Sequence, residues 1–238
     1  MTNKVIIHDV LETATAGGAG LVGFADLSGT PESLRSNLPF SVSFAVPLNP
    51  SIASGISLGP TPEYSIEYDR VNRLIDGIAT SIAGVISDAG YRSIPASSTV
   101  MEINKSTFST NFLPHKTSAT RAGIGWIGRC ALLVTRKYGS AVRLGTVFTD
   151  MPVFCGEPIV KSLCGECCEC VSHCPAQALT GRKWQSGLER QEMYNVQSCY
   201  NHVKQNSLRP EIGKTNCGIC IAVCPWTKKY LTRSNSAN

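Results

Sequence analysis

An α+β fold is predicted for this chain by two features of its sequence. Helical and strand-like patterns alternate over residues 1–150, and the cysteines gather after that point. Residues 1–150 hold a single cysteine, Cys130, whereas residues 151–238 hold ten. We therefore expect an α/β core over residues 1–150 and a second domain, organised by cysteine ligands, over residues 151–238.

The first elements of the core follow from apolar patterning. Residues 5–15 are predicted to form a short helix and residues 20–25 a strand. Residues 41–48 have the apolar density of a buried strand. Two further strands are expected at residues 131–135 and 142–148, joined by a turn that contains Gly139.

The longest helix is predicted over residues 61–89. Thr61 can cap its start, Pro62 suits its first turn, and Gly90 ends it. Apolar residues recur along it at steps of three and four, and they form one stripe: Val71, Leu74, Ile75, Ile78, Ile82, Val85 and Ile86. We expect this stripe to pack against a sheet; an interface with a partner is the other interpretation.

Composition narrows the class of protein. A hydrophobic content of 42% and a charged content of 16% are those of an ordinary globular protein. No stretch approaches the ~20 apolar residues of a membrane span, and no export signal is visible, so we expect a cytoplasmic protein without a membrane partner. The formal charge of +5 does not by itself indicate a nucleic-acid partner, and none is expected.

The first cysteine run has the spacing of a bacterial ferredoxin. Cys164, Cys167, Cys170 and Cys174 form C-x2-C-x2-C-x3-C-P, in which the last cysteine ligates the other cluster of a two-cluster protein. The pattern therefore predicts [4Fe-4S] clusters and electron transfer.

The second run is one thiolate short. Residues 217–225 read C-x2-C-x3-C-P, and Cys199 upstream is the candidate that completes eight ligands. The exchange of the fourth ligand then gives two sets. One cluster is expected on Cys164, Cys167, Cys170 and Cys224, and the other on Cys174, Cys199, Cys217 and Cys220.

Zinc binding and disulfide bonding are the two other roles that the cysteines could have. Zinc sites favour paired C-x2-C units without a third spacing that ends in proline, and disulfides are typical of secreted chains. Of the three remaining cysteines, we expect Cys130 to pack as a small buried hydrophobe, and Cys155 is a candidate reactive thiol. Cys168 would be a ligand only if the register of the first run slipped by one residue.

A block upstream of the cysteines resembles the epoxyqueuosine reductase family. Residues 121–129 read R-A-G-I-G-W-I-G-R and residues 144–150 read L-G-T-V-F-T-D, close to motifs of that family. The ending of the second run, C-P-W, is similar as well, although Thr227 stands where the family usually has Asn. The resemblance covers roughly residues 95–230, and reductive dehalogenases share the architecture.

This resemblance implies a nitroreductase-like α/β core that binds cobalamin and receives electrons from a ferredoxin-like double-cluster domain. The glycines of the block allow close approach of the backbone to such a cofactor, while a turn packed on the sheet explains them equally well. The residues implied in cofactor binding are Arg121, Gly123, Gly125, Trp126 and Gly128.

Two departures from the family matter for function. The catalytic Asp expected about a dozen residues before the block is missing, because residues 106–116 contain no carboxylate. His115 and Lys116 are the candidates for a substitute proton donor, with a solvent-facing loop pair as the alternative. The helical repeats with which the family reads tRNA are also not expected here.

These observations predict an oxidoreductase that passes electrons from a low-potential donor, through two [4Fe-4S] clusters, to a cobalamin or a small-molecule substrate in the core. The alternative is an electron-transfer or activator protein that reduces a partner corrinoid protein and has no substrate of its own. A tRNA-modifying enzyme is a third interpretation, which needs a nucleic-acid platform.

Overall fold

The computed structural model describes residues 3–99 and 112–235. The chain divides into two compact units, each assembled from three segments. The first unit consists of Met1–Pro47, Val71–Ile124 and Arg143–Ile159, and the second of Leu48–Arg70, Gly125–Val142 and Val160–Asn238. This division differs from the single boundary at residue 150 that the cysteine content suggested, because two earlier segments pack with the cysteine-rich one.

The first unit is built on a four-stranded sheet with the strand order β1-β2-β6-β3. Its strands are β1 (Leu21–Asp26), β2 (Phe40–Pro47), β3 (Ser93–Ala96) and β6 (Val142–Thr149). β1 pairs antiparallel with β2, and β3 pairs antiparallel with β6. The strands expected at residues 20–25 and 41–48 are thus confirmed as β1 and β2.

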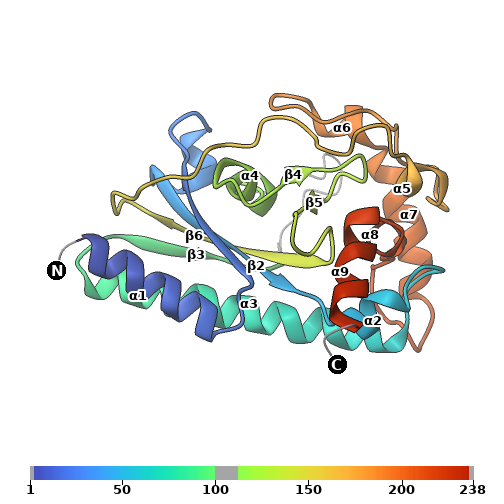
Figure 1. Cartoon of the computed structure of the whole chain (residues 1–238), viewed down its shortest axis with the longest axis horizontal. Helices are drawn as coiled ribbons and strands as arrows, with labels where there is room; N and C mark the ends of the chain where they lie inside the picture. Colours follow the sequence, from blue (N-terminus) through green and yellow to red (C-terminus); the bar gives the residue numbers. More distant parts are fainter. Residues whose placement is uncertain (1–2, 100–111, 236–238) are drawn as a thin grey trace. The chain divides into compact units, whose positions relative to one another are not determined.

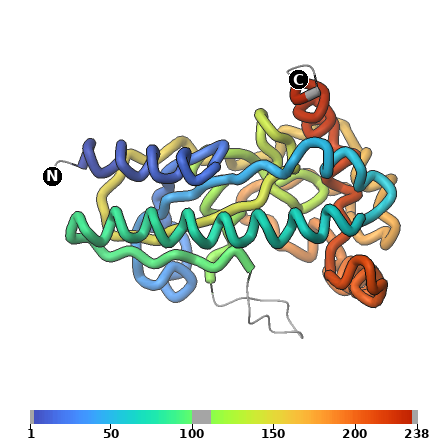
Figure 2. The backbone as a smooth tube through the Cα atoms, turned by 90° about the horizontal axis from the view of Figure 1, so that it is seen from below, coloured from blue at the N-terminus to red at the C-terminus, as the bar shows by residue number. Residues whose placement is uncertain are grey.

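Helices cover both faces of this sheet (Figure 1). α1 (Asn3–Ala16) and α3 (Pro62–Asp88), whose residues from Val71 onward belong to this unit, lie along one face, and α4 (His115–Arg121) lies on the other. α1 and α3 run side by side (Figure 2), where the missing side chain of Gly17 makes room for Ile78. The short helix predicted for residues 5–15 is therefore confirmed.

α3 begins and ends as its sequence predicts. The Thr61 hydroxyl accepts a hydrogen bond from the Tyr64 backbone N–H at 3.2 Å, and Gly90 adopts the left-handed conformation just beyond the helix. The predicted stripe is buried at five of its seven positions: Val71, Ile75, Ile78, Ile82 and Ile86. Burial of this stripe within the unit supports core packing over a partner interface.

The core of the first unit joins the sheet to its surrounding loops. One cluster of buried residues comprises Ala25, Leu27, Leu38, Ala96, Leu113, Ala122 and Phe148. β1 is connected to β2 through the 3₁₀ turn η1 (Glu32–Arg35). No helix in the described ranges is both long and apolar enough to cross a membrane.

The second unit consists of short elements that surround the cysteines. Its helices are α2 (Pro50–Ser54), α5 (Glu169–Ser172), α6 (Arg190–Met193), α7 (Val196–Ser207), α8 (Ile219–Ala222) and α9 (Pro225–Asn235). A two-stranded sheet pairs β4 (Trp126–Ile127) with β5 (Leu133–Val134). The strand predicted at residues 142–148 is confirmed as β6, and the strand predicted at residues 131–135 is present only as β5. The two do not pair, because β5 and β6 belong to different sheets.

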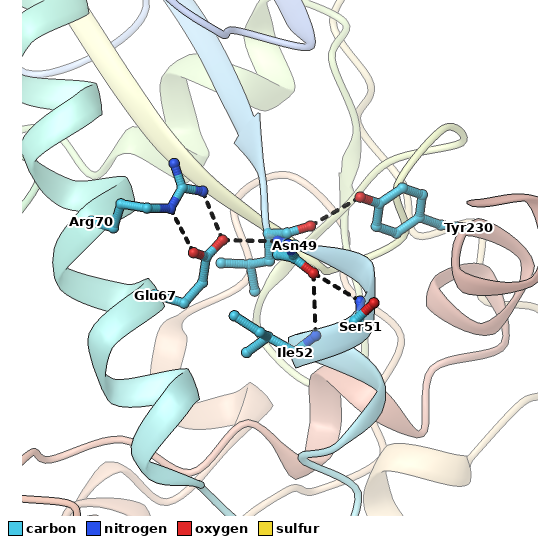
Figure 3. A network of polar contacts seen from close by, with 7 residues as sticks. Asn49, Ser51, Ile52, Glu67, Arg70 and Tyr230 are labelled. Carbon is cyan, nitrogen blue, oxygen red and sulfur yellow. Dashed lines mark hydrogen bonds and ion pairs between the residues drawn. The ribbon is translucent and has the colours of Figure 1, made fainter. Parts of the chain in front are cut away.

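The buried carboxylate of Glu67 links residues of the segment Leu48–Arg70 by hydrogen bonds (Figure 3). Glu67 is 3% exposed and accepts hydrogen bonds from the Asn49 backbone N–H at 2.8 Å and from Arg70 Nε at 2.6 Å. Burial alone would raise the pKa of Glu67, but these hydrogen bonds hold it below its usual value. The Tyr230 hydroxyl donates to the Leu48 carbonyl at 2.9 Å, so α9 is fastened to the same segment.

Candidate metal centre

All eight predicted ligands lie in the second unit, and none of the chain's eleven cysteines is in a disulfide. Cys224 is buried, and the other seven candidates are partly exposed. The cysteines are therefore available as thiolates, which is the form that ligates iron.

The first run folds as a tight loop followed by one turn of helix. Gly165 adopts a left-handed conformation with φ of 58°, and the Cys167 backbone N–H donates to the Cys164 carbonyl at 3.2 Å. α5 then carries Cys170 and precedes Cys174, whose sulfur accepts a hydrogen bond from the Ala178 backbone N–H at 3.4 Å. This turn of helix moves the fourth cysteine out of the loop that carries the first three.

The second run repeats this arrangement. Gly218 is left-handed with φ of 88° and precedes α8, which carries Cys220. Cys224 follows α8, and Pro225 starts α9. Any side chain at Gly218 would collide with Ile56, so the glycine is required both by its conformation and by packing. α5 and α8 pack against each other, which brings the two runs together.

Electrostatic interactions link the four thiols of the second predicted set. Burial raises the pKa of Cys199, and the charges of Cys174 and Cys217 raise it further. Burial likewise raises the pKa of Cys220, followed by the charges of Cys217, Cys170, Cys199 and Cys174. Cys174, Cys199, Cys217 and Cys220 thus lie within one another's fields, and Cys220 also lies within the field of Cys170 from the other predicted set.

The other predicted set is brought together from both runs. Burial raises the pKa of Cys224, and the charge of Cys164 adds to that rise. Cys170 differs, because a hydrogen bond from the Cys130 thiol lowers its pKa. A Cβ atom placed on Gly128 would lie 3.1 Å from Cys130 Sγ and 3.5 Å from Cys164 Sγ, so the glycine-rich block reaches the same place.

Cys130 is therefore more than the buried hydrophobe expected from sequence. It is 7% exposed, as predicted, but its thiol also donates to Cys170. The sequence shows only that Cys130 follows the glycine-rich block. That position does not predict a contact with Cys170, 40 residues later in the chain. The remaining two cysteines, Cys155 and Cys168, are exposed.

Arg129 is a second residue at this centre that sequence reasoning missed. It is 8% exposed, and its guanidinium donates to the carbonyls of Gly165, at 3.0 Å, and of Gly181. The positive charge of Arg129 contributes to the lowered pKa of Cys170, after the larger effects of hydrogen bonding. Arg129 thus connects the glycine-rich block to the loop of the first run.

The first half of the glycine-rich block belongs to the first unit. Arg121 ends α4 and donates from Nη1 to the Asp26 carbonyl at 3.0 Å. Gly123 is left-handed, and a Cβ atom there would lie 2.9 Å from the Glu157 carbonyl oxygen. Gly123 therefore allows the backbone near Glu157 to pack closely against it, and the space is not left open for a cofactor.

The second half packs in the same manner within the second unit. A side chain at Gly125 would collide with the Val134 carbonyl. Trp126 is fully buried, and its ring meets that of Trp226 edge-on with centroids 5.2 Å apart. Gly128 faces the sulfur atoms named above. These contacts support the packed-turn interpretation of the block.

His115 and Lys116 lie on α4 in the first unit. His115 Nε2 is 3.0 Å from the Ser97 carbonyl oxygen, and Nδ1 is 2.8 Å from the Thr146 hydroxyl. Because a carbonyl only accepts, Nε2 carries the proton and Nδ1 accepts from Thr146. Burial lowers the pKa of His115, so the ring is neutral at pH 7. Residues 106–111 of the segment without a carboxylate lie outside the described residues.

The chain is similar to proteins of known families. Residues 163–227 match the 4Fe-4S double cluster binding domain family. The chain is 30% identical to an epoxyqueuosine reductase of Pseudomonas aeruginosa over 68% of its own length and 41% of the relative's. It is 25% identical to a tetrachloroethene reductive dehalogenase of Dehalobacter restrictus over 94% of its own length and 40% of the relative's.

Two solved structures share the fold. One is a reductive dehalogenase whose structure suggests a mechanism for B12-dependent dehalogenation, with a TM-score of 0.67, 19% identity, and coverage of 96% of this chain and 33% of the other. The second is an epoxyqueuosine reductase with an epoxyqueuosine-modified tRNA-Tyr stem loop, with a TM-score of 0.57, 20% identity, and coverage of 95% and 66%.

The fold and the site together define an iron–sulfur protein of mixed α/β structure with a 4Fe-4S double cluster domain. The chain is a homologue of the epoxyqueuosine reductases and reductive dehalogenases. It spans about two fifths of the length of the two curated relatives. Both named relatives are reductases, which supports an oxidoreductase in general terms.

Proposed function

We propose that this protein is an iron–sulfur oxidoreductase that passes electrons through two [4Fe-4S] clusters to a cobalamin or a substrate held by its N-terminal core. The observation that carries the proposal is the meeting of eight free cysteines from distant segments in one unit, in two groups that mix the two runs. Eight thiolates in two such groups match the requirement of two cubane clusters.

The ligand sets follow from which thiols influence one another. Coupling of Cys224 to Cys164 supports the first set, which also takes Cys167 and Cys170. The mutual coupling of the other four supports the second set: Cys174, Cys199, Cys217 and Cys220. Each run then lends its last cysteine to the other cluster, as in two-cluster ferredoxins.

In the part of the chain that the structure describes, no three cysteine sulfurs gather as closely as the ligands of a single zinc ion do. Four thiolates around one zinc, at about 2.3 Å each, lie about 3.8 Å apart. Among the described residues, the group of three or more His, Cys, Asp or Glu donor atoms that gathers within 4.8 Å is His8, Asp9 and Glu12, which contains no cysteine. A cubane holds its four sulfur ligands farther apart than one ion does.

When bound, [4Fe-4S] clusters supply one-electron transfer at a potential set by charge, hydrogen bonding and solvent exposure. The chain contributes those three controls. It buries Cys224, donates the Ala178 N–H to Cys174, and places the Arg129 guanidinium beside the first set. Its cysteines all being free fits a reducing compartment such as the cytoplasm.

The proposal that the core binds cobalamin is supported by the similar proteins, not by contacts in this structure. A reductive dehalogenase that shares the fold is described in terms of B12-dependent dehalogenation, which also motivates a nitroreductase-like core here. The glycines of the block do not support cobalamin binding, because the space beside Gly123 and Gly125 is filled by backbone of the same chain. We therefore assign no cobalamin contact to them and derive no catalytic step through the cofactor.

Titration of the reconstituted protein with cobalamin tests this part. Protein purified without oxygen and loaded with iron and sulfide is mixed with cobalamin, and the corrinoid absorption spectrum is recorded. A saturable spectral change is expected. An unchanged spectrum with full iron content would remove cobalamin from the proposal while leaving the clusters in place.

A second candidate function is an electron-transfer or activator protein that reduces a partner and has no substrate of its own. The state of His115 favours it, since both ring nitrogens are engaged and its lowered pKa makes it a poor proton donor at pH 7. The discriminating measurement is reduction of an added corrinoid protein by the loaded chain, compared with turnover of free cobalamin.

Modification of tRNA is the third candidate function, and it can be tested separately. A homologue has been solved with a modified tRNA stem loop, so a nucleic-acid partner belongs among the candidates. Loss of queuosine from the tRNA of a deletion strain, restored by the wild-type chain, would favour this interpretation over both others.

A further inference from the structure

Arg129 has one hydrogen-bond donor for which the chain supplies no acceptor. The side chain is 8% exposed, and two of its three nitrogens donate to the carbonyls of Gly165 and Gly181. Its third nitrogen, Nε, is fully shielded from solvent and has no acceptor among the described residues. A buried charged donor without an acceptor is costly, so an acceptor at this place is expected.

The position of Arg129 indicates which acceptor this is. Gly165, which accepts from Nη2, directly follows Cys164 in the first run. Gly128, which directly precedes Arg129, faces the sulfur atoms of Cys164 and Cys130. The guanidinium is therefore held against the loop of the first cysteine set by its hydrogen bond to Gly165, while its hydrogen bond to Gly181 fixes it from outside that loop.

The charge of Arg129 is not cancelled by a buried carboxylate at this place. Glu166 Oε2 lies 3.9 Å from Nη2, but the Glu166 side chain is 89% exposed and its other oxygen is 2.5 Å from Lys183 Nζ. An exposed pair of this kind is largely screened by water. The positive charge therefore acts mainly on what lies inside the loop.

We propose that Arg129 donates an Nε–H···S hydrogen bond to the [4Fe-4S] cluster on Cys164, Cys167, Cys170 and Cys224, and thereby raises the reduction potential of that cluster. Arg129 is a positioning and potential-setting residue, and the inference rests on the proposed function. Reduction adds one negative charge to a cluster, so a buried cation and donor stabilise the reduced state more than the oxidised state.

Redox titration of variants tests the inference. The loaded protein is reduced stepwise, and the paramagnetic signal of each cluster is followed, after iron and sulfide analysis. Arg129→Gln is expected to make reduction of one cluster about tenfold harder, a shift of about 59 mV for one electron, and to leave the other unchanged. Arg129→Lys, which keeps the charge, should shift that potential less.

Arg182 provides the matched control. It is an arginine of the same unit that is paired with Glu192 and is 58% exposed, so Arg182→Gln should shift neither potential. Two unchanged potentials in an Arg129→Gln protein with full iron content would overturn the inference. A wild-type chain that binds no more than about four iron atoms would instead contradict the proposed function, so the two failures are distinguishable.

A measurement on the wild-type protein covers the case in which Arg129→Gln does not retain the cluster. Arginine carrying an isotopic label at Nε is incorporated, and the magnetic coupling between that nitrogen and the reduced cluster is measured. A coupling that disappears in Arg129→Lys supports the hydrogen bond. A loaded, reduced wild-type protein without any coupling overturns it.

Discussion

The two cysteine sets are assembled in the same way but differ in what surrounds them. In the first set, Cys170 accepts a hydrogen bond from the Cys130 thiol and feels the charge of Arg129, so its pKa is lowered. In the second set, burial and the neighbouring thiolates raise the pKa of Cys199, Cys217 and Cys220. Arg129 and the Cys130 thiol thus act on Cys170 of the first set, whereas burial and neighbouring thiolates dominate at three of the four cysteines of the second set. Cys224 of the first set resembles the second set, because burial raises its pKa.

This difference shows how one chain can hold two chemically identical clusters at different potentials. Arg129, which ends the glycine-rich block, and Cys130, which follows it, act on the first set, whose ligands come from the cysteine-rich segment like those of the second. Because added negative charge is favoured near a cation, we expect the first cluster to be reduced more easily than the second.

Removal of one ligand from each set should have the largest effect on this comparison. Cys220→Ala and Cys164→Ala are each expected to lower the iron content from about eight to about four atoms, because each destroys one cluster. Iron and sulfide analysis of the purified variants measures the loss. The signal that remains should differ between the two variants, since a different cluster survives in each.

The three cysteines outside the sets give the control for that experiment. Cys168→Ala, Cys155→Ala and Cys130→Ala should each retain about eight iron atoms. Loss of a cluster in Cys168→Ala alone would mean that the first run binds in a shifted register. Loss in Cys130→Ala would mean that the Cys130 thiol is a ligand instead of a donor to Cys170.

A smaller effect is expected from crowding beside Cys224, which completes the first set. Gly139 is left-handed with φ of 58°, and any side chain there would collide with Thr227, three residues after Cys224. Gly139→Ala should therefore lower the free energy of unfolding by about 3 kcal/mol and weaken retention of the first cluster more than the second. Chemical unfolding of the loaded protein measures the first quantity.

Gly213 offers a matched comparison for Gly139. It has nearly the same conformation, with φ of 60°, but a Cβ atom there would meet nothing within 4 Å. Gly213→Ala should cost only about 1 kcal/mol and leave both clusters in place. Equal losses for the two variants would show that Thr227 yields to the added methyl group.

His115 should give the smallest effect, and one that is independent of both cysteine sets. Its folded-state pKa lies below the ordinary 6.5, so the unfolded chain binds the proton more readily. The contribution of the neutral ring to stability is complete above about pH 6.5 and is lost as the pH falls through the folded-state pKa. His115→Gln should remove this part of the pH dependence of unfolding while the iron content stays the same.

Local signals in the sequence predicted much of the fold. Caps and periodicity identified α1 and α3, and apolar density identified β1 and β2. Cysteine spacing predicts which four thiols share each cluster, because a short loop and one turn of helix direct the fourth sulfur away from the first three. That grouping stays a prediction: the couplings of Cys199 to Cys174 and of Cys224 to Cys164 fall within it, whereas the coupling of Cys220 to Cys170 crosses it.

Contacts between distant segments could not be predicted in the same way. Nothing in the block at residues 121–129 indicates that Arg129 meets a loop 36 residues later, or that β5 pairs with β4 instead of β6. His115 was a reasonable proton donor by residue type, but its partners Ser97 and Thr146 are set by tertiary structure. Thr227, a departure from the related family, is explained only in the structure, where its hydroxyl accepts from the Ser140 N–H at 3.1 Å.

The exchange of ligands between the two runs is tested most directly by Cys224→Ala. Cys224 belongs to the second run in sequence, but the charge of Cys164 on its thiol assigns it to the first set. The paramagnetic spectrum of the reduced, half-loaded variant is compared with those of Cys164→Ala and Cys220→Ala. A spectrum that matches Cys164→Ala is predicted, and a spectrum that matches Cys220→Ala would contradict the exchange of ligands.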